Sequence, residues 1–250
     1  MSDTEERRVV IVTGAGSGVG EATARALHAT GHVVVLAGRT VERLQRVADE
    51  LGDSCLVVPT DLAEPDSCEQ LISRTIAEYG HLDALVNNAG HLEVVPLPDL
   101  DHHMLERSLK VNMVGPALLV KHAWDHFAGR DSGCIINVSS MASLDPLPNL
   151  TAYAAGKSAL DSLTRSILAE RPSENIRAFT ISLGAVETDM LRNLVDEEAL
   201  PTDQCLTPAQ VAGHVCELID GTHDHRQGEV MTYRKQDLAE STGRNGSTPS

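Results

Sequence analysis

Residues 8–31 read RVVIVTGAGSGVGEATARALHATG. The β-branched run at 8–12 predicts a buried strand, and the good helix formers after the glycines predict a helix that stops at Gly31. Glycine lets the chain between them turn tightly and approach a pyrophosphate, whose charge is favoured at a helix N-terminus. A simple tight turn is the alternative, but the flanking strand and helix favour nucleotide binding through Gly14, Gly18 and Gly20.

The same alternation of short apolar runs and helical stretches continues along the chain. Strands are expected at residues 32–37, 55–58, 82–86, 135–140, 175–183 and 228–233, and helices at 41–51, 65–79, 102–127, 151–170 and 208–219. This order predicts an α/β fold: a doubly wound parallel sheet (Rossmann fold) of about seven strands, with helices on both faces. We expect a single domain over residues 8–236, flexible ends at 1–7 and 237–250, and a flexible substrate loop at about 190–207.

Composition excludes several classes of partner. The 250 residues carry a formal net charge of −16, and no basic stripe is visible, so nucleic acid is not expected. No window of about 18 apolar residues predicts a membrane span. The first eight residues, MSDTEERR, lack an apolar signal region, and the five cysteines show no paired spacing. These features predict a cytoplasmic protein with reduced thiols.

The end of the second strand bears on cofactor choice. Dinucleotide-binding folds place an acidic residue near this position to hold the ribose hydroxyls, or an arginine to hold a 2′-phosphate. This chain has Gly38 and Arg39 there, with no Asp or Glu. The planar, permanently charged guanidinium suits phosphate, which favours NADP(H) over NAD(H). An exposed arginine at the start of a helix is the alternative reading.

A tyrosine and a lysine stand four residues apart in the predicted helix at 151–170. Tyr153 and Lys157 therefore share one helix face, and Ser140 ends the strand before them. A nearby ammonium favours the phenolate and lowers the pKa of a tyrosine, which would fit Tyr153 for proton transfer with an alcohol oxygen. Such a pair also occurs by chance in many helices, so its weight depends on the motifs that precede it.

The polar motifs fall at the carboxyl ends of predicted parallel strands, where ligands bind in such sheets. The residues concerned are Gly14, Arg39, Asp61, Asn88, Ser140 and Gly184. Asn112, beside Gly115 and Pro116, predicts either a bend in its helix or a bound water. His122 and His126 stand four apart without a third ligand, and we expect no metal site.

Taken together, TGAGSGVG, NNAG at 87–90, Asn112, Ser140 and Tyr153-x-x-x-Lys157 closely resemble the short-chain dehydrogenase/reductase family over roughly residues 8–234. The resemblance implies that Tyr153 is the general acid and that Lys157 lowers the pKa of Tyr153 and binds the nicotinamide ribose. It further implies that Ser140 holds the substrate oxygen and that Asn112 anchors a relay water. It also implies cofactor contacts from Gly14, Ser17, Gly18, Val19, Gly20, Arg39, Asp61, Leu62, Asn88, Val186 and Thr188.

The expected activity is NADPH-dependent reduction of a carbonyl compound, or the reverse oxidation of an alcohol, with a medium-sized, fairly apolar ketone as substrate. A nucleotide-sensing protein without catalysis and an epimerase or dehydratase that uses the same tyrosine are the alternatives. The family resemblance further implies a homodimer or homotetramer formed through the helices of Asn112 and Tyr153. The chain departs from the family pattern in two places. Leu183-Gly184 replaces the usual Pro-Gly, which predicts a looser nicotinamide end of the pocket. The last strand lacks its usual Gly-Gly ending, which counts against a tetramer.

Overall fold

The computed structural model describes residues 7–237, and it confirms the predicted α/β class. Seven parallel strands form one sheet in the order β3-β2-β1-β4-β5-β6-β7. The order reverses between β1 and β4, which makes this the switch point at which ligands bind in open parallel sheets. The strands are β1 (Val9–Thr13), β2 (Val33–Gly38), β3 (Cys55–Pro59), β4 (Ala84–Asn87), β5 (Gly133–Ser140), β6 (Ile176–Leu183) and β7 (Val230–Tyr233).

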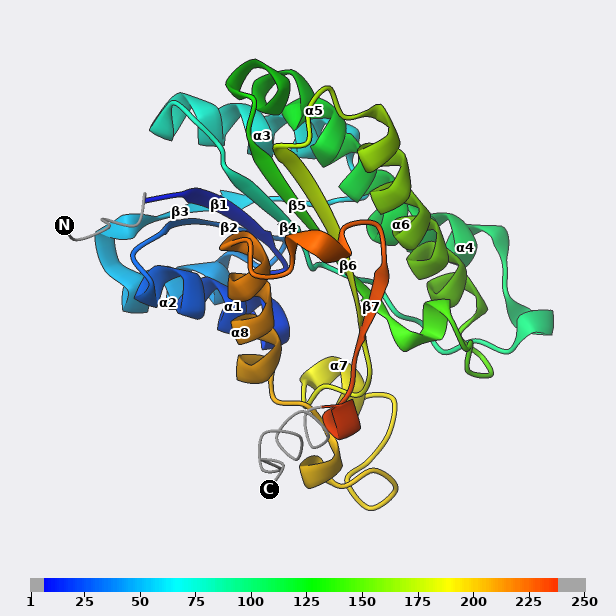
Figure 1. Cartoon of the computed structure of the whole chain (residues 1–250). Helices are drawn as coiled ribbons and strands as arrows, with labels where there is room; N and C mark the ends of the chain where they lie inside the picture. Colours follow the sequence, from blue (N-terminus) through cyan, green and yellow to red (C-terminus); the bar gives the residue numbers. More distant parts are fainter. Residues whose placement is uncertain (1–6, 238–250) are drawn as a thin grey trace, which may run out of the picture.

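Helices cover both faces of the sheet, as Figure 1 shows. The group α1, α2 and α8 lies on one face, and the group α3, α5 and α6 lies on the other. Their bounds are α1 (Gly18–Ala29), α2 (Val41–Leu51), α3 (Pro65–Tyr79), α4 (His102–Leu109), α5 (Gly115–Arg130), α6 (Thr151–Glu170), α7 (Asp189–Arg192) and α8 (Pro208–Ile219). Four of the expected helices, α2, α3, α6 and α8, have the predicted bounds.

Alternating side chains of each strand divide the core into two layers. In β5, Ile136 packs with the α1, α2 and α8 side, whereas Ile135 packs with the α3 and α5 side. Both side chains are fully buried, as is the whole of β1. A parallel sheet covered on both faces needs such continuous apolar runs, which explains why RVVIV and its counterparts show no polar alternation.

The expected continuous helix over residues 102–127 is wrong in one respect. The chain forms α4, then a π-helical turn at Lys110–Val114, and then α5, which runs on to Arg130. Asn112 lies inside the π-helical turn and is fully buried. A π-helical turn inserts an extra residue into the helix, so the predicted irregularity at Asn112 is real.

The segment after β6 is partly ordered by its own contacts. Val186 forms a parallel bridge with Leu206, and α7 lies between them in the chain. Arg192 pairs with Glu187 and donates a hydrogen bond to the Leu200 carbonyl at 2.8 Å. The expected loop at 190–207 therefore holds a short helix and fixed contacts. The ends expected at 1–7 and 237–250 lie outside the described residues, apart from positions 7 and 237. No helix within 7–237 is long and apolar enough to cross a membrane.

Candidate active site

A cleft of about 910 Å³ opens at the carboxyl edge of the sheet. It runs from the glycine-rich turn after β1, past the ends of β2 and β3, to the start of α6 and the segment after β6. All but two of the site residues expected from sequence line it: Gly14, Ser17, Gly18, Val19, Arg39, Asp61, Leu62, Asn88, Ser140, Tyr153, Lys157, Val186 and Thr188. The other two, Gly20 and Asn112, lie beneath its surface.

The glycine-rich turn is tight because it must pass close to the strand end of β4. Gly14 and Gly18 adopt φ of 68° and 55°, which glycine tolerates and other residues rarely do. A Cβ on Gly20 would overlap the carbonyl of Gly14, and one on Gly14 would come within 2.9 Å of Asn88 Nδ2. Gly20 thus lets α1 start directly under the turn. The glycines leave the N-terminus of α1 open toward the cleft, as an anion-binding loop requires.

Thr13 ties the two cofactor motifs together, although sequence reasoning missed it. Its hydroxyl donates to the Val86 carbonyl at 3.1 Å and accepts from the backbone amides of Asn88 and Ala89 at 2.9 and 3.0 Å. The Asn88 side chain then donates to the Thr13 carbonyl at 2.8 Å. The available signal was a polar residue at the end of an otherwise apolar strand.

Two arginines line the end of the cleft near β2. Arg39 and Arg43 are exposed, and within residues 7–237 neither forms an ion pair. Arg46, one turn further along α2, is instead held by Glu21 at 2.5 Å. Positive charge is therefore available where Arg39 was expected to meet a 2′-phosphate, and Arg43 is a second cation there that the sequence analysis missed.

The opposite end of the cleft is closed by the segment that follows β6. Thr188 lies against the glycine-rich turn, since a Cβ on Gly18 would sit 3.1 Å from its Cγ2. The amide of Gly184 donates to the Tyr233 carbonyl at 3.0 Å. Leu183 is buried and pairs with Ser140 on one side and Tyr233 on the other. Leucine in place of proline therefore extends the strand pairing to the edge of the cleft.

Tyr153 and Ser140 meet on the floor of the cleft. The serine hydroxyl forms a hydrogen bond with the tyrosine and also accepts one from the Ala142 amide at 3.2 Å. Only 9% of Tyr153 is exposed. Burial raises the pKa of Tyr153, and the Ser140 hydrogen bond acts against that rise. Lys157 is not among the groups that shift this pKa in the chain by itself, so its expected lowering of the Tyr153 pKa stays a prediction.

Lys157 is buried beside Tyr153 on α6. Its ammonium lies 5.8 Å from the centre of the Tyr153 ring and donates to the Val138 carbonyl at 2.7 Å. Burial lowers the pKa of Lys157 to about 8, while the negative charge of Asp161 acts to raise it. Asp161 is itself buried, and it follows Lys157 by one turn of α6. Sequence reasoning missed this carboxyl, although the spacing of four was visible.

Asn112 reaches the same region from the π-helical turn. Its side-chain amide donates to the His91 carbonyl at 2.7 Å and to Ser108 at 3.1 Å, and its Oδ1 accepts from the His91 amide at 3.0 Å. A Cβ on Gly90 would lie 3.4 Å from Asn112 Oδ1 and 3.7 Å from Lys157 Nζ. Asn112 therefore fixes the chain after β4 beside the lysine.

A buried polar chain fixes α6 against the sheet. Asn87 donates to Asn137 at 2.8 Å, Asn137 donates to Thr164 at 2.8 Å, and the hydroxyls of Thr164 and Thr180 lie 2.6 Å apart. These residues belong to β4, β5, α6 and β6 in turn. Because an unpaired buried polar group is costly, the chain of bonds sets the position of α6, and with it Tyr153 and Lys157.

The two histidines considered from sequence, His122 and His126, both lie on α5. His126 Nε2 accepts a hydrogen bond from the Leu82 amide at 3.0 Å, which occupies that ring nitrogen. Among the described residues, neither His122 nor His126 belongs to a group of three ligating side chains.

The family model for short chain dehydrogenases matches residues 8–199 of this chain. The matched range includes Ser140, Tyr153 and Lys157. The chain belongs to the short-chain dehydrogenase family. Cis-4-hydroxycyclohexanecarboxylate dehydrogenase of Sinomonas cyclohexanicum is 38% identical over 198 residues, which are 78% of this chain and 79% of that protein. The chain also matches mycobacterial oxidoreductases at 32% identity, of which it spans about two thirds of the length.

Solved structures of this family share the whole architecture. A 3-ketoacyl-(acyl-carrier-protein) reductase from Brucella melitensis complexed with NADH superposes with a TM-score of 0.84 at 28% identity, covering 90% of this chain and 96% of that one. A putative NAD(P)-dependent gluconate 5-dehydrogenase from Beutenbergia cavernae with bound NADP gives a TM-score of 0.84 at 29% identity, covering 93% and 97%. Structural neighbours in the short-chain dehydrogenase family thus include both NADH and NADP complexes.

Proposed function

We propose that this short-chain dehydrogenase is an NADP(H)-dependent oxidoreductase that reduces a carbonyl group or, in reverse, oxidises an alcohol. The observation that carries the proposal is the meeting of Tyr153 with Ser140 above the buried Lys157, in the same cleft as the glycine-rich turn. A proton donor and a nucleotide-binding loop in one cavity are the two parts that this reaction needs.

The chain's residues fit a dinucleotide. A Cβ on Gly14 or Gly20 would strike backbone or Asn88, so glycine there lets the turn fold tightly and α1 begin beside the cleft, where a helix N-terminus can meet a phosphate group. Gly14, Ser17 and Gly18 would hold the pyrophosphate, Asp61 and Asn88 the adenosine half, and Val186 and Thr188 the nicotinamide amide. When bound, the nicotinamide supplies or accepts the hydride.

The protein's part in the reaction is to hold the substrate oxygen and move its proton. Ser140 would donate a hydrogen bond to that oxygen and stabilise the negative charge that develops there. The Tyr153 hydroxyl would then give up its proton to the same oxygen, and in the reverse direction the Tyr153 phenolate would take a proton from the alcohol. Because burial raises the pKa of Tyr153, the phenol is protonated at neutral pH and ready to act as an acid. Lys157 supplies positive charge beneath the ring as the phenolate forms.

Replacement of the phenol tests the mechanism. We expect Tyr153→Phe to lower kcat for ketone reduction at least about a hundredfold, as loss of a general acid does, with coenzyme binding measured by fluorescence retained. Tyr79→Phe is the matched control, since Tyr79 lies at the end of α3 and outside the cleft lining. Equal activity in Tyr153→Phe and Tyr79→Phe would contradict the proposed role.

We propose a preference for NADP(H) because Arg39 and Arg43 present unpaired cations at the cleft end near β2. An arginine fork that binds a 2′-phosphate discriminates through charge-assisted hydrogen bonds worth about 1.5–3 kcal/mol. Arg39→Ser is therefore expected to raise KM for NADPH about tenfold or more and to leave KM for NADH little changed. A wild-type enzyme that uses NADH better than NADPH would refute the preference.

For the substrate we propose a medium-sized, fairly apolar ketone or the matching alcohol. Leu147 and Met190 line the cleft with 56% and 41% exposure, and Leu150 and Leu194 add apolar surface. Assaying net NADPH consumption with a graded panel of ketones separates this reading from a nucleotide sensor and from an epimerase or dehydratase, neither of which consumes coenzyme. Turnover of strongly polar or charged ketones alone would contradict it.

We also propose a homodimer or homotetramer built through α5 and α6. On α6, the small side chains Ala155, Ser158 and Ser162 face outward, and small residues let two helices approach closely. Light scattering on the purified chain measures the assembly, and a monomer at micromolar concentration would count against it.

A further inference from the structure

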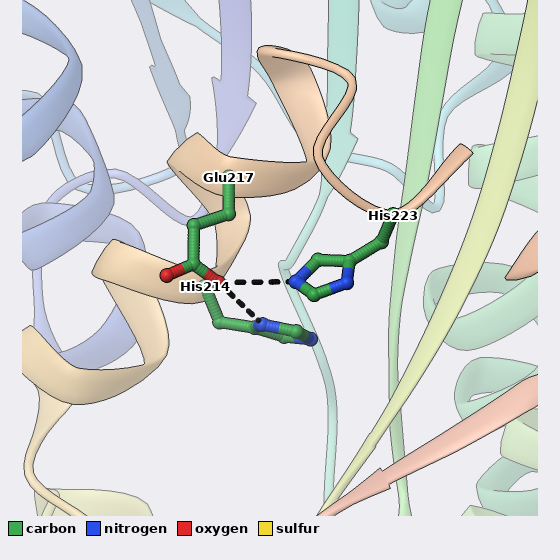
Figure 2. A group of neighbouring side chains, drawn as sticks. All are labelled: His214, Glu217 and His223. Atoms are coloured by element: carbon green, nitrogen blue, oxygen red, sulfur yellow. Dashed lines mark hydrogen bonds and ion pairs between the residues drawn. The ribbon is translucent and has the colours of Figure 1, made fainter. Parts of the chain in front are cut away.

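Three potential metal ligands converge where α8 meets the turn that follows it. His214 and Glu217 stand three apart on one face of α8, and His223 follows in the turn after that helix (Figure 2). Nδ1 of His214 and Nε2 of His223 each lie 3.2 Å from the same carboxylate oxygen of Glu217. None of the three residues lines the cleft. The proposed oxidoreductase reaction therefore leaves this cluster unexplained.

We propose that His214, Glu217 and His223 bind a divalent transition-metal ion, with Zn²⁺ as the best match. Two imidazole nitrogens and one carboxylate oxygen form a ligand set that suits Zn²⁺, whereas Mg²⁺ and Ca²⁺ require oxygen ligands. Water would complete a tetrahedral site, since Glu217 is half exposed.

The geometry is close to what a zinc ion requires. Ligand atoms bonded at about 2.0–2.2 Å in a tetrahedral site lie roughly 3.3–3.6 Å apart, and both nitrogen-to-oxygen distances, at 3.2 Å, are close to the lower end of that range. All three ligand atoms lie within 4.8 Å of one another, so the closing movement is small. The dashed contacts in Figure 2 show both rings directed at the carboxylate.

The first ligand is held in place before any ion arrives. The His214 ring stacks on Tyr233, with ring centres 4.6 Å apart and planes inclined by 6°, and only 10% of its side chain is exposed.

A bound ion would cross-link α8 to the turn that leads into β7. Tyr233 ends β7, stacks on His214, and accepts the Gly184 amide hydrogen bond at the edge of the cleft. The ion would thus stabilise the outer strand of the sheet, and it would take no part in proton or hydride transfer. Since it binds the folded arrangement only, it should raise the melting temperature progressively, with the logarithm of its concentration above the dissociation constant.

The test uses the whole chain without a histidine tag, first stripped of metal with a chelator. Titration with ZnCl₂ against a chromogenic chelator is expected to show one tight site, and ZnCl₂ should raise the melting temperature. Binding should weaken as the pH falls and the imidazoles take up protons. A wild-type chain that binds no Zn²⁺, or whose binding is unchanged by acid, would overturn the proposal.

Variants locate the ion. His223→Ala and Glu217→Gln should each weaken zinc binding at least about tenfold, because each removes a direct ligand. His225→Ala is the matched control: it lies two residues further along the same turn, is exposed, and stands outside the ligand group. His225→Ala is expected to bind like the wild type, and an equal loss in this variant and in His223→Ala would refute the site. These readouts do not depend on the oxidoreductase reaction, so either proposal can fail alone.

Discussion

At the scale of single residues, the charge on Lys157 is the quantity that the surrounding protein controls. The ammonium is buried and donates to one backbone carbonyl. The negative charge of a second buried group, the Asp161 carboxyl, favours the charged form of Lys157. Burial alone favours the neutral amine, and Asp161 counteracts it. Asp161 does not line the cleft, so in the proposed mechanism it would act through Lys157 as a positioning residue.

This arrangement predicts a pH effect. With a pKa of about 8, Lys157 loses its proton as the pH rises through that value, and reductase activity that needs the ammonium should fall on the alkaline side. Asp161→Asn removes the charge that raises this pKa, so the alkaline limb of the kcat profile should move to lower pH.

The control for that variant is Glu170→Gln, at the exposed end of the same helix. Its pH profile should match the wild type. An unshifted limb in Asp161→Asn would mean that Asp161 carries no charge in the folded enzyme, since burial raises its own pKa.

At the scale of elements, close approaches of backbone decide where helices lie. Gly115 begins α5 after the π-helical turn, and a Cβ there would come 2.6 Å from the Leu62 carbonyl and 2.7 Å from its Cβ. Leu62 lines the cleft beside Asp61. The start of α5 is therefore packed directly beneath the expected adenosine end of the site.

Two glycines of α5 form a matched pair for a stability measurement. Gly115→Ala must displace Leu62, so we expect a lower free energy of unfolding, by about 1–3 kcal/mol as for overpacked sites, and weaker coenzyme binding. Gly129→Ala meets nothing within 4 Å, and alanine is the better helix former, so it should be neutral or stabilising by up to about 1 kcal/mol. Urea denaturation measures both, and equal effects would contradict the packing argument.

At the scale of the whole molecule, the sequence predicted the sheet and the residues at its carboxyl edge. Apolar runs that alternate with helical stretches leave few other folds, and parallel strands bring their carboxyl ends together whatever the loops do. The spacing of thirteen residues between Ser140 and Tyr153 could not show whether the two side chains point toward each other. The raised pKa of Tyr153 follows from burial, and the direction of the Lys157 ammonium follows from its bond to the Val138 carbonyl; neither has a signal in the sequence.

Other features needed the folded chain for a similar reason. The π-helical turn at Asn112 follows from hydrogen bonds to His91, a residue 21 positions earlier. The cluster of His214, Glu217 and His223 forms because the turn after α8 folds back over the helix. Neither contact has a fixed spacing that a pattern could reveal.

The polar chain from Asn87 through Asn137 and Thr164 to Thr180 has a consequence for how this enzyme can diversify. It anchors α6 to the sheet through buried side chains that do not line the cleft, whereas the apolar rim near Leu147 and Met190 belongs to other segments. Exchanges in the rim can therefore alter which molecules are accepted while the reacting hydroxyls keep their places. New selectivity could arise here by a few rim exchanges without rebuilding the chemical machinery.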